Sequence, residues 1–149
     1  MEWITRLPLT QLQLDADLDT ESVRTLAECR WLRSIASLKL SSTNGAALCV
    51  LAQSPNLIGL HRLDLSWNSR TTTSDVVLAL AHSPYLSELE ALGLGSCWDV
   101  DEAAIRALLD SPHLRKLKQL HINTSFLSDT IAAEIRQRFK IDSLSFPLS

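Results

Sequence analysis

The chain has 149 residues, and 46% of them are hydrophobic, which suits one packed domain and excludes a linker or a disordered tail. Its 14 lysines and arginines are nearly balanced by 17 aspartates and glutamates, so the formal net charge is only −3. Domains that bind nucleic acid usually carry a basic patch, and this sequence has no run of basic residues. The composition therefore predicts no nucleic-acid partner.

The cysteines and the N-terminus favour a reducing compartment. Cys29, Cys49 and Cys97 are an odd set without C-x-x-C spacing, and residues 1–6 lack the basic and apolar regions of a secretory signal. No stretch approaches 18 apolar residues, the length that a membrane-spanning helix needs. We therefore expect a cytoplasmic protein without a membrane partner.

One pattern recurs five times along the chain. Its clearest copy is LHRLDLSWN at residues 60–68, which reads L-x-x-L-x-L-x-x-N. The central leucine of this pattern recurs every 25 to 29 residues, at Leu12, Leu38, Leu63, Leu92 and Leu120. A short strand repeated at this period is typical of solenoids, in which each turn packs only on its neighbours.

Residues 1–8 precede the first predicted strand. A solenoid needs a cap over the open core of its first turn, and eight residues make only a partial cap. Either these residues fold over the end, or an upstream segment or a second chain completes the cap. Self-association through the first repeat therefore stays open as an alternative.

Apolar residues spaced three and four apart predict a helix after each strand. The predicted helices cover about residues 20–30 and 46–53, and the last three begin at Ser74-Asp75, which we expect to be an N-cap pair, at Asp101-Glu102 and at Ser128-Asp129. Three of the helices are followed by a Ser-Pro pair, at residues 54–55, 83–84 and 111–112. Because proline disfavours helix for the residue before it, we expect each of these helices to stop at the serine.

Two further segments complete the chain. The loop at residues 69–73 presents Arg70 where a repeat would place an inward apolar residue, so we expect this loop to bulge from the rim. Residues 141–146 alternate like a final edge strand, and Pro147 would block further pairing. We therefore predict one domain over residues 1–149, with a partial cap at 1–8, five repeats at 9–140 and a strand cap at 141–149.

The run DEAAIRALLDSPHL at residues 101–114 is similar to repeats of bacterial leucine-rich proteins. From residue 9 to residue 146 the array resembles the ribonuclease-inhibitor-like class of leucine-rich repeats. This resemblance implies an α/β, right-handed, horseshoe-shaped solenoid with a parallel sheet on its concave face. It implies a function less specifically, because such arrays bind many unrelated partners. The chain departs from the pattern at Asp17 and Thr43, which replace the usual asparagine, and at Arg70.

Residues that flank the inward leucines are expected to face the concave side of the sheet. Aligned by repeat, they form three columns that are polar and mixed in charge: Gln11, Ser37, Arg62, Ala91 and Gln119; Gln13, Lys39, Asp64, Gly93 and His121; and Asp15, Ser41, Ser66, Gly95 and Asn123. This surface is either a solvated sheet face or the place where a protein partner docks.

Trp67 and Trp98 come directly after equivalent parts of two neighbouring repeats, so both are expected near one rim. Large aromatic residues at a rim are frequent binding hot spots, and the alternative is that they fold back over the loop edge. Trp31 is expected to be packing and Trp3 part of the cap. Cys97 and Cys49 are expected to have structural roles. The predicted partner-binding residues are Lys39, Arg62, Asp64, Ser66, Trp67, Trp98, His121 and Asn123.

Catalysis is not expected. Strands of a sheet lie about 4.8 Å apart, so Asp64 and His121, two strands apart, would be separated by about 10 Å, whereas a base and its orienting acid need contact at about 3 Å. The four histidines fall at non-equivalent repeat positions, which predicts no metal site and no cofactor. The sequence therefore favours a non-catalytic protein-binding scaffold. The alternative is a structural or targeting segment of a larger protein or oligomer.

Overall fold

Five strands form one open, parallel sheet in the computed structural model, which describes residues 9–68, 70–95 and 99–139. The order in the sheet is the order in the chain, so each strand pairs with the next. The strands are β1 (Gln11–Asp15), β2 (Ser37–Ser41), β3 (Arg62–Asp64), β4 (Ala91–Gly95) and β5 (Gln119–Ile122). The predicted alternation of parallel strands with helices is confirmed.

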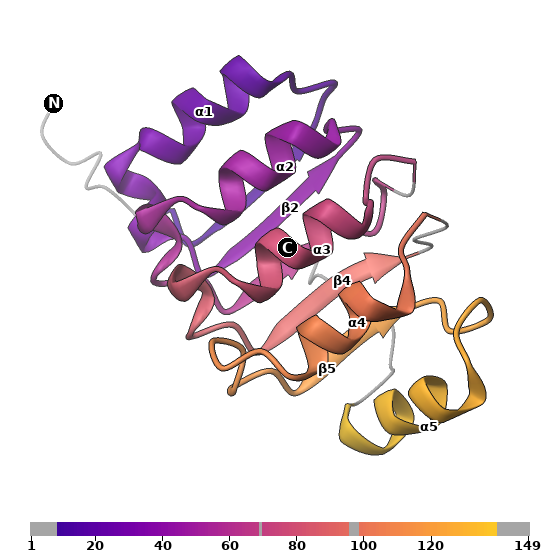
Figure 1. Ribbon diagram of the computed structural model, residues 1–149. Coiled ribbons are helices and arrows are strands. Elements are labelled where there is room, and N and C mark those ends of the chain that lie inside the picture. Colours follow the sequence, from indigo (N-terminus) through magenta and orange to yellow (C-terminus); the bar gives the residue numbers. More distant parts are fainter. Residues whose placement is uncertain (1–8, 69, 96–98, 140–149) are drawn as a thin grey trace, which may run out of the picture.

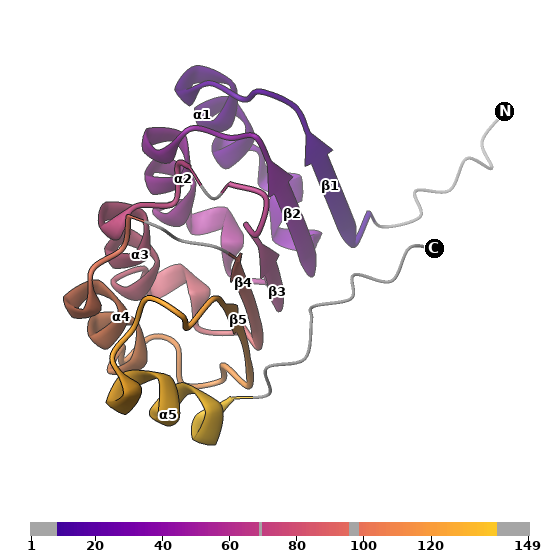
Figure 2. The same ribbon diagram turned by 90° about the vertical axis from the view of Figure 1, so that its right-hand side faces the viewer.

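A helix follows every strand, and all five helices lie on the same face of the sheet (Figures 1 and 2). They are α1 (Thr20–Glu28), α2 (Gly45–Ala52), α3 (Ser74–Ala81), α4 (Glu102–Leu109) and α5 (Asp129–Arg138). Three short 3₁₀ helices lead back toward the strands: η1 (Arg30–Ser34), η2 (Pro55–Leu57) and η3 (Pro84–Leu86). Within the described residues no helix covers the opposite face, and the architecture is compatible with a repeat solenoid.

The repeated leucines form the core between the sheet and the helices. Side chains two residues apart on a strand share a face, so Leu38 and Leu40 both point inward, as do Leu92 and Leu94. These leucines are fully buried, and the predicted inward residues of the helices lie in the same cluster, among them Leu51, Leu80 and Ile105. In the first turn Leu12 and Leu14 are only partly buried.

The strand register confirms two of the three predicted columns. Gln13 pairs with Lys39, Lys39 with Asp64, Asp64 with Gly93, and Gly93 with His121. The column from Gln11 to Gln119 is also in register. The third column is wrong beyond its first pair, because β3 ends before Ser66 and an irregularity in β4 pairs Gly95 with Ile122 instead of Asn123.

Several helix boundaries differ from the prediction. α1 ends at Glu28 because a 3₁₀ helix takes over, and the N-cap of α3 is Thr73, one residue before the predicted pair. The helices before the Ser-Pro pairs end two residues before the serine, so the serine is not the last helical residue. In two cases it caps the following 3₁₀ helix instead, as Ser54 does by accepting a hydrogen bond from the Asn56 amide.

These serines also join neighbouring turns. The hydroxyl of Ser54, which follows α2, donates at 2.6 Å to the carbonyl of Ala27 in the last turn of α1. Ser83 and Ser111 donate in the same way to Ala52 and Ala81. A helix leaves its last carbonyls without internal partners, so each serine satisfies one acceptor of the turn before it.

The loop before α3 is tied to the preceding turn. Arg70 is exposed, but Thr72 is fully buried, and the Thr71 hydroxyl donates to the carbonyl of Thr43 at 2.7 Å. The expected bulge of this loop is therefore wrong for residues 70–73.

Residues 1–8, Ser69, Cys97, Trp98 and the predicted strand at 141–146 lie outside the described residues. No helix of the described chain is long and apolar enough to cross a membrane.

Candidate interaction face

The rim beyond β2 and β3 carries Trp67, the most exposed large hydrophobic residue of the described chain, with 71% of its surface accessible. The alternative that this ring folds back over the loop edge is therefore wrong. An open hollow of about 320 Å³ beside it is lined by Gln13, Asp15, Lys39, Ser41, Ser42 and Trp67. A second hollow of about 270 Å³ lies against the same ring, next to Arg70 and Thr71. Trp67 therefore offers an aromatic surface at the edge of a polar sheet face.

Asn68 fixes the backbone beside this tryptophan. Its side-chain amide donates to the carbonyls of Leu40 at 2.7 Å and Leu65 at 3.1 Å, and its oxygen accepts from the Thr43 amide at 2.7 Å. The side chain is almost fully buried, so these bonds are shielded from water. The exposed ring of Trp67 thus immediately precedes an anchored residue that joins two turns of the array.

Asp64, one of the predicted partner-binding residues, is nearly buried and hydrogen-bonded. Only 4% of its surface is exposed, and its Oδ1 accepts from the Ser66 amide at 2.9 Å. Aspartate side chains often accept a hydrogen bond from the backbone amide two residues later, and this bond stabilises the turn after β3. Ser66 is partly exposed beside it, and Lys39 lies at the neighbouring register position of β2, partly buried.

His121 lies on β5, next to Gly93 in the register. Its Nδ1 is buried, with no hydrogen-bond partner within the described residues. β4 separates it from Asp64, so the structure does not bring the two side chains together as a catalytic pair. Asn123 directly follows this strand, and its side-chain oxygen accepts from the Ser125 amide at 2.9 Å. Over the described chain, no three histidine, cysteine, aspartate or glutamate residues are placed to hold a metal ion.

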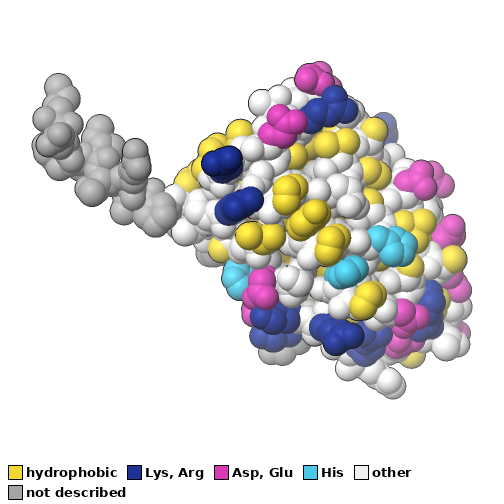
Figure 3. Space-filling model, turned by 60° about the vertical axis from the view of Figure 1, so that its left-hand side comes forward, with side chains coloured by type: hydrophobic (Ala, Val, Ile, Leu, Met, Phe, Trp, Pro, Cys, Tyr) yellow, Lys and Arg dark blue, Asp and Glu magenta, His cyan; other side chains and the backbone are white. Residues whose placement is uncertain are grey.

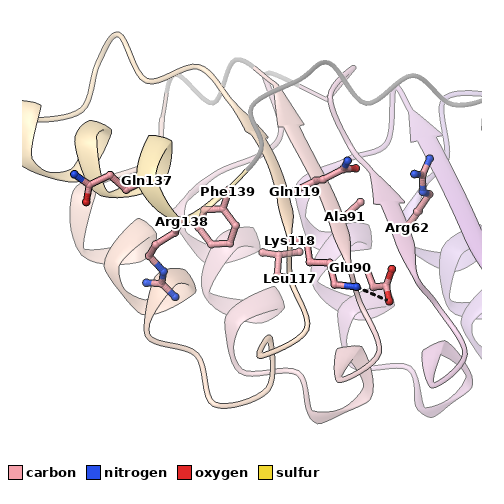
Figure 4. Close-up of a pocket in the computed structure, with 9 residues that line it drawn as sticks. All are labelled: Arg62, Glu90, Ala91, Leu117, Lys118, Gln119, Gln137, Arg138 and Phe139. Atoms are coloured by element: carbon pink, nitrogen blue, oxygen red, sulfur yellow. Dashed lines mark hydrogen bonds and ion pairs between the residues drawn. The ribbon is translucent and has the colours of Figure 1, made fainter.

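A third hollow, of about 490 Å³, lies where β3, β4 and β5 begin, beside the end of α5. Figure 4 shows Arg62 at one side, Gln137, Arg138 and Phe139 at the other, and residues of β4 and β5 between them. The sequence analysis placed only Arg62 among its binding residues. The missed basic residues, Lys118 and Arg138, lie just before β5 and at the end of α5, where the repeat frame assigns no outward position.

Hydrophobic side chains also gather on the side of the molecule where helices lead into strands (Figure 3). Trp31 in η1 has 46% of its surface exposed, and Ile58 after η2 is similarly exposed. The prediction that Trp31 is packed inside is therefore wrong, because η1 turns this ring outward while the adjacent Leu32 enters the core.

Two cysteines lie within the described residues. Cys29 is the C-cap of α1, and Cys49 lies in α2. Burial, and then the charge of Asp75, raise the pKa of the Cys49 thiol, which disfavours the reactive thiolate. The Cys29 thiol donates to the carbonyl of Thr25 at 3.2 Å at the end of α1. These surroundings agree with a packing role for Cys49.

No protein-family model matches this sequence, and no curated protein matches it either. The function is therefore argued below from the residues of this chain and from their geometry.

Proposed function

We propose that this chain is a leucine-rich-repeat solenoid of the ribonuclease-inhibitor-like class, resembling bacterial arrays, and that it is a non-catalytic, cytoplasmic scaffold for a protein partner. The leucine frames in register and the buried Asn68, which satisfies backbone groups of two turns, support the repeat assignment. The sheet face opposite the helices and the rim beside it would form the binding surface, as in other solenoids.

The observation that carries the proposal is the exposure of Trp67. A tryptophan with 71% of its surface in water offers much apolar area to a partner at a low entropic cost. It stands beside a hollow with Gln13, Asp15 and Lys39, so hydrogen-bonding groups surround the ring. This combination of an aromatic centre and a polar border is typical of binding hot spots.

The test compares two exposed tryptophans on different sides of the molecule. A partner isolated with the chain from its native cells should bind Trp67→Ala roughly thirtyfold more weakly, which corresponds to the loss of about 2 kcal/mol that is typical of a hot spot. Trp31→Ala is the matched control, because it removes the same side chain from the helix-to-strand side. Calorimetry should give unchanged affinity for Trp31→Ala. Equal losses for the two variants, or no loss for Trp67→Ala, would reject the proposed face.

A second candidate function is a structural segment of a larger protein or oligomer. The observation that favours it is the first turn, where Leu9 is 52% exposed and Leu12 and Leu14 are only partly buried. A second chain packed against this turn would cover these leucines. Sedimentation analysis over a range of concentrations tests this alternative, since self-association should be lost in Leu9→Gln.

A further inference from the structure

The hollow beside β5 and α5 combines an apolar floor with a basic border. Leu117, Ala91 and Phe139 line it with apolar side chains, of which Leu117 is partly exposed and the other two are almost fully buried. Three cationic side chains line it, from Arg62, Lys118 and Arg138, against the single carboxylate of Glu90. The lining is therefore net positive, although the whole chain has a formal charge of −3.

Two of the three cations are available to a ligand. Within the described residues Arg62 forms no ion pair, and Lys118 pairs with Glu90 at a long 3.4 Å. Both members of that pair are exposed, the Lys118 side chain by 69%, so the pair stabilises little and water or a ligand replaces it readily.

Arg138 has a different role, because its guanidinium is already bonded. It forms an ion pair with Glu134 at 3.1 Å and donates to the carbonyl of Leu109 at 2.9 Å. It also lies over the ring of Phe139, with 5.3 Å between the Arg138 Cζ and the centre of the ring. These contacts hold Arg138 and Phe139 in place at one wall of the hollow (Figure 4). The hollow therefore has one fixed cationic wall and two cations that can adapt.

We infer that this hollow binds an acidic peptide segment of the protein partner, with an apolar side chain on the floor and carboxylates at Arg62 and Lys118. The inference rests on the proposed function, because Arg62 belongs to the same sheet face. Arginine binds carboxylates through two parallel hydrogen bonds, which makes such a contact specific as well as attractive. A nucleic acid fits less well for two reasons. A binding groove that follows the phosphate backbone needs more positive charge than the three cations of this hollow, and the ring of Phe139 is too buried to stack on bases.

The experiment selects 12-residue peptides from a randomised displayed library on the full chain. Enriched peptides should place aspartate or glutamate next to an apolar residue. Their affinity, measured by fluorescence anisotropy, should fall at least fivefold in Arg62→Gln and further in the double variant with Lys118→Gln. The affinity should also fall as salt is raised. Arg30→Gln is the matched control, because it removes an exposed arginine at the start of η1 and should leave the affinity unchanged.

Other outcomes overturn the inference in distinguishable ways. Peptides that depend on Trp67 but not on Arg62 would keep the proposed function and reject the acidic ligand. No enrichment, or enrichment of neutral or basic peptides, would reject it as well. Tighter binding of single-stranded oligonucleotides with the same dependence on Arg62 would assign the hollow to nucleic acid. Binding of a synthetic peptide of residues 140–149 with that dependence would assign it to this chain itself.

Discussion

At the scale of single residues, Asn68 uses its whole side chain to join two turns. The three hydrogen bonds reach Leu40, Leu65 and Thr43, and all of them are buried. A buried donor or acceptor left without a partner costs about 1–3 kcal/mol. Replacing Asn68 would therefore remove its own hydrogen bonds and also leave buried backbone groups without partners.

We predict that Asn68→Ala lowers the free energy of unfolding by about 3 kcal/mol, since several backbone groups lose their partners in a water-poor site. Asn123→Ala is the control, because the Asn123 side chain makes one exposed bond, to the Ser125 amide, and should cost about 1 kcal/mol or less. Urea denaturation measures both values. Equal costs would mean that the bonds of Asn68 contribute no more than a surface turn.

Residue identity indicated the site only in part. Trp67 could be singled out because an aromatic follows the strand frame, and it is exposed. For Asp64, strand alternation predicts which way the side chain points, but not that the Ser66 amide would bind its carboxylate and the surroundings would bury it. Lys118 and Arg138 were missed because only the folded chain brings the ends of β5 and α5 together.

At the scale of elements, helices α4 and α5 are joined by charged side chains as well as by the core. Glu134 in α5 receives hydrogen bonds from Arg106 in α4 at 2.7 Å and from Arg138 in its own helix at 3.1 Å. The bond to Arg106 first, and then that to Arg138, hold the pKa of Glu134 below its usual range. The folded chain therefore favours the ionised carboxylate.

This shift predicts how stability depends on pH. The stabilisation is present above the unfolded pKa of about 4.3 and is lost as the pH falls through the lower folded value. Glu134→Gln should therefore flatten the loss of stability below about pH 5, as measured by urea midpoints between pH 3 and pH 7. Glu28→Gln, at an exposed residue at the end of α1, should keep the wild-type slope. A wild-type slope in Glu134→Gln would contradict this account.

The helices were predictable in number and position, because apolar spacing of three and four residues marks the face that meets the sheet. Their ends were less predictable. Proline was expected to end each helix at the serine, but the serine hydroxyl instead reaches a carbonyl in the preceding turn. A contact 27 to 31 residues away in the chain leaves no local pattern to read.

At the scale of the whole molecule, each turn contacts mainly its neighbours, so stability should be a sum of local terms and interface terms. The sequence indicated a thin cover on the first turn, and Leu12 is only partly buried, whereas Leu92 on the interior strand β4 is fully buried. The first turn of the array is thus less well covered than an interior turn.

We predict that Leu92→Ala costs about 2–5 kcal/mol, the usual range for a buried leucine, and that Leu12→Ala costs less. The reason is that Leu12 has less apolar surface removed from water. Denaturant midpoints of the two variants test this difference. Equal losses would mean that the first turn is as well covered as the centre.

The central claim is that a protein partner binds the sheet face opposite the helices, and photo-crosslinking tests it most directly. A photoreactive residue would replace Gln13 or Gln119 on the sheet. As controls, it would replace Arg24 or Ala103, which are exposed residues on the helices. In the presence of the isolated partner, crosslinks should form from Gln13 and Gln119 and be nearly absent from Arg24 and Ala103. Crosslinks that form mainly from the helix positions would contradict the account.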